Sequence, residues 1–385
     1  MTGSIRRRGK MTWELTFDLG PDPVTGERTR KFVSVKGKRS DAERVLTEEI
    51  HQRNTGFDVA RGKLTVKQYL NRWLIDYAAT NVSPATLVRY KGIVANHLLP
   101  AIGRLQLADL RPAHIQRMYA EALRAGGRKD RRAGGLSART VLQHHRVFRE
   151  ALAHAVRWQL IARNPADAVA TPKPTRHELS VLDPNGAQLL LASCAQDPLH
   201  CLIYLALATA ARQGELLALR WRDVDWTTQT VRITRTAQRM PGKGIVFHAP
   251  KTHRSIRPIA LSPVTLRILK THRTAQAEHR LAMGSDYVDH DLVFASALGA
   301  PLDGTNVTKR FERLARDAGL GHVRFHDLRH SAATLMLVAG TNPKIVSERL
   351  GHATVNITLD TYSHVLPDMQ HEAARLIDQL LTRTK

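Results

Sequence analysis

The chain has 385 residues, and 43% of them are hydrophobic, which is enough to bury the cores of about two or three domains. Its formal net charge of +24 is far more than a solvated surface needs, so a nucleic acid is the expected partner. A membrane protein is disfavoured, because no apolar run approaches the ~18 residues that span a bilayer and no basic amphipathic anchor carries aromatic residues.

The first 62 residues predict a small β-sheet backed by one helix. The opening MTGSIRRRGK continues into polar sequence, so no signal peptide is predicted and we expect a cytoplasmic, nucleoid-associated protein. WELTFDLG and RTRKFVSVKG alternate as strands around the turn PDPVTGE, and residues 40–54 predict a helix with Ser40 as its N-cap. Basic side chains on neighbouring strands can enter a DNA groove, although a solvated sheet face is the alternative. The candidate DNA contacts are Arg6, Arg7, Arg8, Arg28, Arg30 and Lys31.

Residues 63–174 have helical periodicity and predict an all-α domain of four helices. Thr65 and Ser83 are the expected caps of the first two helices, with Pro84 at the first helical position of the second. Nineteen Lys or Arg stand against six Asp or Glu in residues 63–175, which favours a face that contacts phosphates over a balanced, solvated bundle. Candidate contacts in the basic loop AGGRKDRRAGG are Arg128, Lys129, Arg131 and Arg132.

The last part of the chain follows the proline-rich segment NPADAVATPKPTRHE, which is predicted to be a linker. Beyond it, several helices alternate with a short β region. QTVRITRT, IVFHAP and SIRPIAL are expected to form three strands of one hairpin-linked sheet, and VF at residues 293–294 a further short strand. Helices are expected at DPNGAQLLLASCA, DPLHCLIYLALATA, SPVTLRILKTHRTAQAEHRL, GTNVTKRFERLARDAG, HDLRHSAATLMLVAG, NPKIVSERLG and MQHEAARLIDQLLTRT.

Several stretches of this last part carry cationic or hydrogen-bonding side chains where packing does not require them. In HDLRH, His326, Arg329 and His330 occupy positions i, i+3 and i+4, which share one face of a helix. Converging donors of this kind suit an anion. A zinc site is disfavoured, because no Cys, Asp or Glu stands at ligand spacing and arginines would repel a cation. In chain order, the candidates are Arg212 at a helix start, Lys251 in a turn between strands, His326, Arg329, His330, His352 and Tyr362.

The order of these groups resembles that of the tyrosine recombinases, the lambda-integrase class of site-specific recombinases. TAARQGELLALRW at residues 209–221 is similar to the family pattern T-G-x-R-x-G-E-l-x-x-L-x-W, and PKTHRSIRPIAL is similar to PKTxxSxRxxPL. HDLRHSAAT and LGHATVNITLDTYSHV follow the family pattern as well. Ala210 replaces the family's usual glycine, so the turn before Arg212 is not expected to use positive φ freely.

The resemblance implies a multidomain tyrosine recombinase fold. Its parts would be a small α+β arm-type DNA-binding domain (residues 1–62), an all-α four-helix, SAM-like core-binding domain (63–174) and a mainly α catalytic domain with a small antiparallel sheet (175–385). It also implies a site-specific recombinase that integrates or excises a phage or other mobile element through a 3′-phosphotyrosyl intermediate and a Holliday junction. The implied partners are double-stranded attachment-site DNA, a homotetramer on that DNA, and host bending and excision factors.

Phosphodiester chemistry explains why the family needs these residue types. Tyr362 would be the nucleophile, and its phenol, with a pKa of about 10, needs a proton acceptor, which the resemblance assigns to His326. Arg212 and Arg329 would grip the nonbridging oxygens, where negative charge develops in the transition state. Lys251 would protonate the leaving 5′-oxygen. No metal, ATP or other cofactor is expected, because the phosphotyrosyl bond retains the energy of the phosphodiester.

Three more residues complete the expected site. His352 would donate a hydrogen bond to the phosphate, Glu215 would orient Arg212 or a histidine, and His330 is either a supporting contact or a packing residue. The helix in residues 370–385 either packs in the chain's own core or docks into a neighbouring subunit. The alternative functions are a chromosome- or plasmid-resolving recombinase, a type IB topoisomerase, and a DNA-binding regulator with a decayed site. The last is disfavoured, because every catalytic group is present.

Overall fold

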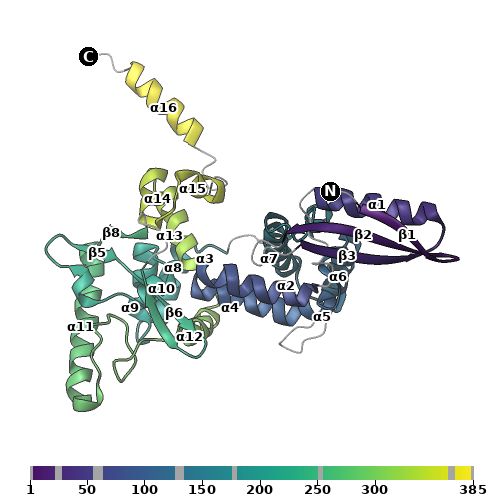
Figure 1. Ribbon diagram of the computed structural model, residues 1–385. Coiled ribbons are helices and arrows are strands. Elements are labelled where there is room, and N and C mark those ends of the chain that lie inside the picture. The colour runs from purple at the N-terminus through teal and green to yellow at the C-terminus, as the bar shows by residue number, and fades with distance from the viewer. Residues whose placement is uncertain are drawn as a thin grey trace. The chain divides into compact units, whose positions relative to one another are not determined.

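The computed structural model describes residues 3–21, 28–54, 64–125, 134–175, 180–249, 255–362 and 369–382 (Figure 1). The chain divides into two compact units, Met1–Arg176 and His177–Lys385, and the division falls within the proline-rich segment predicted to be a linker. Both units are mainly helical, with small antiparallel sheets. Within the described part of the chain, no helix has the length and apolar character needed to cross a membrane.

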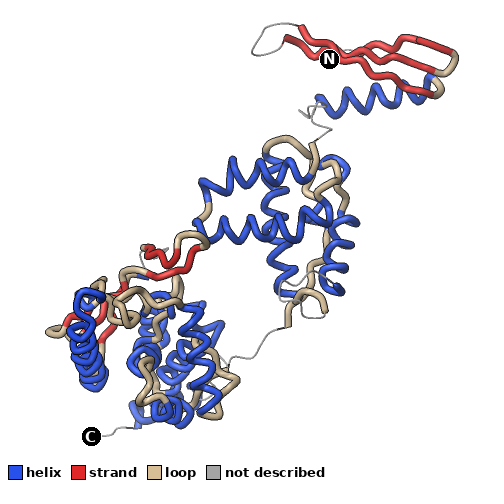
Figure 2. The backbone as a smooth tube through the Cα atoms, turned by 90° about the horizontal axis from the view of Figure 1, so that it is seen from below, coloured by secondary structure: helices blue, strands red, loops and turns tan. Residues whose placement is uncertain are grey.

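The first unit opens with a three-stranded antiparallel sheet that has one helix against it (Figure 2). The strands, in sheet order, are β1 (Gly3–Gly9), β2 (Thr12–Pro21) and β3 (Arg28–Lys36). Helix α1 (Arg39–Asn54) contacts all three strands. Leu15 and Phe17 of β2 pack with Ala42 of α1 in a small core. The alternating apolar residues of the strands therefore face the helix, as their period of two requires.

Two details of this sheet differ from the expectation. Strand β1 was not predicted, because its run of arginines has no apolar alternation to reveal it. The predicted N-cap Ser40 was wrong, since α1 begins at Arg39. The cap is supplied from inside the helix, where the Asp41 carboxylate accepts a hydrogen bond from the Lys38 backbone N–H at 2.9 Å.

Helices make up the rest of the first unit. Helix α2 (Val66–Trp73) runs through a π-helical turn (Leu74–Ala78) into α3 (Ala79–Asn81), and α4 (Pro84–Ile93) runs through a second π-helical turn (Val94–Leu98) into α5 (Leu99–Ile102). Helices α6 (Pro112–Ala125) and α7 (Ala138–Arg157) follow. Short 3₁₀ turns lie at Leu107–Asp109 and Pro165–Ala168. Thr65 and Ser83 are the caps of α2 and α4, as predicted. Trp73, Tyr119 and Phe148 are fully buried in the core between these helices.

In the described part of the second unit, the strands form two small sheets instead of the one that was predicted. Strands β4 (Val224–Asp225), β5 (Thr230–Ile233) and β8 (Arg257–Ala260) form one antiparallel sheet in that order, and β6 (Thr236–Met240) and β7 (Gly244–His248) form a separate hairpin. The predicted IVFHAP strand therefore pairs with the unpredicted, polar β6, while β5 pairs directly with β8. Around the predicted VF strand, the structure has only the isolated bridges Arg220–Leu292 and Ala295–Pro301.

Helices make up most of the rest of the described second unit. They are α8 (Pro184–Ser193), α9 (His200–Thr209), α10 (Gln213–Leu216), α11 (Pro263–Met283), α12 (Gly304–Asp317), α13 (Asp327–Val338), α14 (Pro343–Leu350), α15 (Val355–Tyr362) and α16 (Met369–Thr382), with short 3₁₀ turns at Trp221–Asp223 and Gly284–Asp286. Helix α13 packs along α9, and α14 packs on α15 (Figure 1). This packing brings segments that are far apart in sequence to one place, around Tyr362.

Candidate active site

Arg212 lies at the sharp junction between α9 and α10, where it is the N-cap residue of α10. The junction turns at Ala210, which has φ of 56° and ψ of 21° in the left-handed region. The turn therefore uses positive φ in spite of the alanine, although not freely. A left-handed alanine costs about 1–2 kcal/mol, but Ala210 is fully buried in a small core and its carbonyl oxygen is a hydrogen-bond acceptor for Arg329, which offset that cost.

The close packing around Gly214 explains why the RQGE stretch contains a glycine. A Cβ atom at this position would lie 2.6 Å from Oγ1 of Thr236 and 2.8 Å from the carbonyl oxygen of Ala237. Helix α10 can therefore pack against β6 only with glycine here. The hairpin and the start of α10 hold each other in place, which fixes the direction from which the Arg212 side chain leaves the backbone.

Glu215 fixes the position of Arg212 through hydrogen bonds. Its side chain is only 5% exposed, and it accepts hydrogen bonds at 2.9 Å from both the backbone N–H and Nη1 of Arg212. Burial alone would raise the pKa of Glu215, but its hydrogen bonds and charge interactions with Arg257 and Arg212 outweigh burial, so the pKa lies below its ordinary value. The carboxylate is ionised at neutral pH. The Arg212 side chain is 42% exposed, so it is anchored at one side and open at the other.

Arg329 is a buried cation fixed by backbone carbonyls. It lies on α13, and its Nη1 and Nη2 atoms donate to the carbonyl oxygens of Ala210 and Leu350, each at 2.7 Å. Burial and the nearby charge of Arg212 lower the pKa of Arg329 to about 9, so the guanidinium still keeps its proton at neutral pH. Because Ala210 lies two residues before Arg212, this contact ties the two predicted arginines to one turn of the chain.

Tyr362 ends α15 and is 1% exposed. Its ring packs in the small core that also contains Ala332 and Leu337 of α13 and Leu350 of α14. Burial raises the pKa of Tyr362 to about 12, although the positive charge of Arg329 opposes the change. The phenol is therefore protonated in this conformation, and it lies within electrostatic reach of a predicted phosphate-binding arginine.

The histidine that contacts the Tyr362 hydroxyl is His330. Its Nδ1 atom lies 2.7 Å from the tyrosine oxygen, whereas the ring centroid of His326 lies 5.3 Å from that of His330. Burial and nearby positive charges lower the pKa values of both histidines, so both rings are neutral at pH 7. His330 is thus a direct contact of the tyrosine, which the sequence left undecided. No group of three or more His, Cys, Asp or Glu among the described residues could hold a metal ion.

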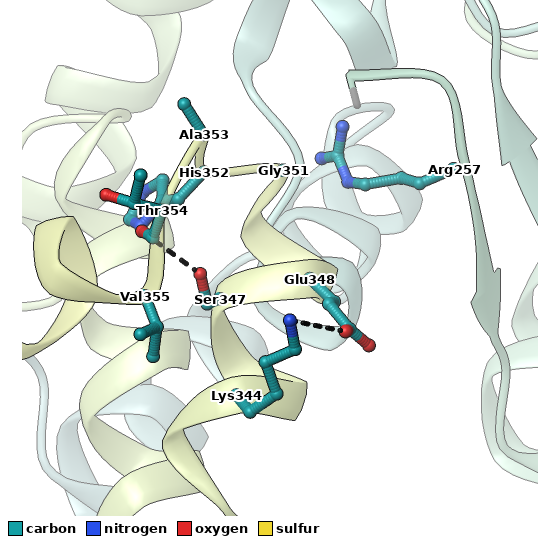
Figure 3. Close-up of a pocket in the computed structure, with 9 residues that line it drawn as sticks. All are labelled: Arg257, Lys344, Ser347, Glu348, Gly351, His352, Ala353, Thr354 and Val355. Atoms are coloured by element: carbon teal, nitrogen blue, oxygen red, sulfur yellow. Dashed lines mark hydrogen bonds and ion pairs between the residues drawn. The ribbon is translucent and has the colours of Figure 1, made fainter. Parts of the chain in front are cut away.

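His352 follows Gly351, which ends α14 in the left-handed conformation with φ of 67°. Its Nδ1 atom lies 2.8 Å from Oγ1 of Thr358, and burial together with the charges of nearby arginines lowers its pKa to about 4. A neutral ring that accepts the Thr358 hydroxyl at Nδ1 carries its proton on Nε2. In that tautomer, His352 can donate a hydrogen bond through its Nε2–H group. It lines a cavity of about 480 Å³ with Arg257 and residues of α14 (Figure 3).

Arg257 is a site residue that the sequence reasoning missed. It is the first residue of β8, it is 5% exposed, and its Nη2 atom donates to Oε2 of Glu215 at 2.9 Å. A signal was present, because strand alternation in SIRPIAL puts Arg257 on the same inward face as Ile259. An arginine at an inward-facing position needs a buried partner.

Other predicted residues are placed only in part. Lys251 and the basic residues of the 126–133 loop, Arg128, Lys129, Arg131 and Arg132, lie outside the described residues, as do the side chains of Arg28 and Lys31 in β3. By strand alternation, Arg6 and Arg30 share the open face of the N-terminal sheet, and Arg8, at a register shift of β1, pairs with Glu14 of the same face. Arg7 lies on the other face, where its guanidinium is 5.9 Å from the Trp13 ring centroid.

A helical fold that gathers a tyrosine with arginines and histidines fits the class of enzymes that attack phosphodiesters with a tyrosine. The description "Phage integrase family" matches residues 180–369, and "Phage integrase, N-terminal SAM-like domain" matches residues 65–123. The chain belongs to the phage integrase family of tyrosine recombinases.

Relatives of similar length support this assignment. The chain is 27% identical to a XerC-like tyrosine recombinase of Caldanaerobacter subterraneus, with 97% of each chain covered. It is 26% identical to the ICEBs1 integrase of Bacillus subtilis, with 98% of this chain and 100% of the relative covered.

Solved structures share the fold. The Tn1549 transposon integrase, residues 82–397 in complex with a circular intermediate DNA, has a TM-score of 0.68 at 19% identity and covers 82% of this chain and 100% of its own. A lambda integrase dimer bound to a COC′ core site has a TM-score of 0.56 at 17% identity, with coverage of 93% and 94%.

Proposed function

We propose that this chain is an integrase that inserts a phage or other mobile element into a chromosome, or excises it, by cutting and rejoining attachment-site DNA. One observation carries the proposal. The Tyr362 phenol and the Arg329 guanidinium interact within one cluster, and Arg329 is bonded to the turn that presents Arg212. A nucleophile near one arginine, which is itself bonded to the turn that presents a second, fits what attack on a phosphodiester requires.

Arg212 and Arg329 are the proposed phosphate ligands. Both guanidiniums are held by protein oxygen atoms, so they need little reorganisation when negative charge develops on the nonbridging oxygens. His352 is the proposed third donor, through its Nε2–H group. The three side chains come from the α9–α10 junction, α13 and the turn after α14, so the site depends on the packing of these elements.

In the proposed reaction, one bond to phosphorus forms and one bond to phosphorus breaks. The Tyr362 oxygen attacks phosphorus, the phosphorus–O5′ bond breaks, and the 3′-phosphate stays on the tyrosine. The phenolic proton passes to His326 as general base, and the 5′-oxygen receives a proton from Lys251. Rejoining is the reverse reaction with a new 5′-hydroxyl, and therefore no metal, ATP or other cofactor enters the scheme.

Tyr362 is not exposed at the protein surface in the described conformation. The ring is buried and its hydroxyl is bonded to His330. We propose that the end of α15 shifts when DNA binds, so that Tyr362 leaves His330 and comes within reach of His326. His330 then stabilises the resting state, and His326 performs the proton transfer.

The first unit is the proposed DNA-binding part, with residues 1–62 as an arm-type domain and residues 63–174 as a core-binding, SAM-like domain. Support comes from the Arg6 and Arg30 side chains on one sheet face and from a groove in the helical part. Arginines in that groove are Arg146, Arg149, Arg157 and Arg163. Phosphate contacts of this kind position a protein on DNA and make its affinity sensitive to salt.

Strand exchange is proposed to occur in a homotetramer, through a Holliday junction. Lambda integrase has been solved as a tetramer bound to a Holliday junction, and that fold matches this chain with a TM-score of 0.54 at 18% identity. A host bending factor and an excision factor are further proposed partners. Helix α16 is the proposed element that docks into a neighbouring subunit.

A suicide substrate tests the proposal. A duplex spanning the junction between element and chromosome, nicked beside the cleavage point, should trap a covalent adduct with the wild-type chain and none with Tyr362→Phe. An equal adduct in both would reject Tyr362 as nucleophile. A plasmid relaxation assay separates the alternative of a type IB topoisomerase, which would remove supercoils from plasmids that lack the junction sequence.

A further inference from the structure

Arg257 makes more buried polar contacts than one ion pair needs. Its Nε atom donates to the Arg349 carbonyl oxygen at 2.7 Å, and its Nη1 atom donates to the Ser255 carbonyl oxygen at 3.0 Å. Its Nη2 atom donates to Oε2 of Glu215 at 2.9 Å. One guanidinium therefore joins the start of β8, the end of α14 and the beginning of α10.

Glu215 transmits this anchoring to Arg212. The carboxylate lies between two arginines, with Arg257 on the buried side at 6% side-chain exposure and Arg212 on the more open side at 42%. Its oxygen Oε1 accepts from Nη1 of Arg212, and Oε2 accepts from the Arg212 backbone N–H as well as from Arg257. Loss of the buried partner would free the carboxylate to rotate, and Arg212 would lose its fixed acceptor.

The same guanidinium lies against the turn that presents His352. A Cβ atom on Gly351 would be 2.9 Å from Nη1 of Arg257, so only glycine admits the arginine this closely. Figure 3 shows Arg257 reaching from its strand toward the Gly351 turn, on the wall of the cavity that His352 also lines. The positive charge of Arg257 also lowers the pKa of His352, after burial and the charges of Arg329 and Arg212.

We propose that Arg257 is a positioning residue for DNA cleavage, which fixes Arg212 through Glu215 and fixes the His352 turn through the Arg349 carbonyl and Gly351. The inference rests on the proposed function, because it assigns Arg257 a part in presenting the phosphate ligands. Arg257 itself does not touch the phosphate. Without it, the two proposed phosphate donors, Arg212 and His352, lose their common support.

A purely structural role makes a different prediction. An arginine needed only for stability would slow cleavage no more than another arginine of the same unit that also donates to a backbone carbonyl oxygen. Arg235 provides that comparison, because its Nε atom donates to the Ala218 carbonyl oxygen at 2.7 Å and its guanidinium lies 4.4 Å from the Phe247 ring centroid. None of these contacts involves Glu215, Arg212 or His352.

The test is the single-turnover rate of adduct formation on the nicked junction duplex, with the full chain in saturating excess. Arg257→Met is expected to slow this step by about 100-fold, the effect of misplacing a reacting group by about 1 Å. Arg235→Met is expected to remain within about threefold of wild type. Arg257→Lys, which keeps a charge but cannot hold three acceptors, is expected to be at least about tenfold slow and carries the test where Arg257→Met does not fold.

A double-mutant cycle with Glu215→Gln separates positioning from packing. If Arg257 acts on Arg212 through Glu215, Arg257→Met should cost far less in the Glu215→Gln background than in wild type. The inference would be overturned if the folded Arg257 variants cleaved at the wild-type rate. It would also be overturned if the losses from Arg257→Met and Glu215→Gln were fully additive and the loss from Arg257→Met equalled that from Arg235→Met. Absence of any adduct with the wild-type chain would instead overturn the proposed function.

Discussion

The Tyr362 hydroxyl oxygen lies 2.7 Å from Nδ1 of His330. This contact distinguishes His330 from His326, although the sequence places both histidines on one helix face. His330 holds the buried phenol, while His326 stands at the start of α13 as its N-cap residue. Since both rings are neutral at pH 7, each could accept a proton. Which of them acts in the reaction can be determined by substitution.

Replacement of each histidine by phenylalanine should give different results. His326→Phe removes the proposed base, so the single-turnover cleavage rate should fall by about 10²–10⁴-fold. His330→Phe keeps a ring in the core and removes the bond to Tyr362. It should lower the free energy of unfolding by about 1 kcal/mol and leave cleavage within about tenfold of wild type.

The control for both histidine variants is DNA affinity at the same salt concentration, which neither change should alter. The reverse ranking of cleavage rates, with His330→Phe the slower variant, would assign the base to His330 and contradict the proposed role of His326.

Arg329→Lys should abolish most activity although it conserves charge. The guanidinium donates at once to the carbonyl oxygens of Ala210 and Leu350, and a lysine cannot maintain both contacts and also reach the phosphate. Cleavage on the suicide substrate should fall by about 10²–10³-fold. Arg310→Lys is a suitable control, because Arg310 pairs with Asp197 away from Tyr362. Nearly normal cleavage by the Arg329→Lys variant would show that a point charge suffices.

Ala210 should tolerate glycine but not valine. Glycine removes the cost of the left-handed conformation and loses one buried methyl group, so these effects nearly cancel and thermal unfolding should change little. Valine adds a β-branched side chain where φ is 56°, and it enlarges a side chain packed near Tyr362. We expect Ala210→Val to lose about 2 kcal/mol or more and to slow cleavage. Equal melting temperatures for the two variants would argue against this backbone conformation.

The sequence located the residues that stand in local motifs, because each motif combines unusual residue types with a fixed spacing. Arg212, Arg329 and Tyr362 were predicted in this way, and the structure places Arg329 within electrostatic reach of both Arg212 and Tyr362. Arg257 was missed, because its partner Glu215 is 42 residues away and only the tertiary fold makes the pair visible.

Other features depended equally on distant contacts. The hairpin of β6 and β7 is polar and has no strong alternation, so its pairing could not be read from the strands alone. The positive φ of Ala210 is stabilised by Arg329, more than a hundred residues later. Contact with His330, as opposed to His326, depends on where α15 ends against α13.

The helical part of the first unit should lose stability as the pH falls from about 6.5 toward 4. His144 of α7 is buried, and its ring stacks on His97 with centroids 4.3 Å apart. Burial and the charge of His97 lower the pKa of His144 to about 4. The folded state therefore binds this proton less readily than the unfolded state, whose histidine has a pKa of about 6.5, so protonation favours unfolding. Stability is complete above pH 6.5, and about 3 kcal/mol should be lost by pH 4.

The His144→Leu variant isolates this contribution. Leucine cannot be protonated, so between pH 7.5 and 5 the unfolding midpoint in urea should fall less for the variant than for the wild-type chain. His279→Leu is the control, because the exposed His279 donates one hydrogen bond from Nε2 to the Ala297 carbonyl oxygen, and its replacement leaves His144 and its contact with His97 in place. Parallel pH profiles for wild type and His144→Leu would mean that His144 can be protonated in the folded core, against the desolvation argued from its burial.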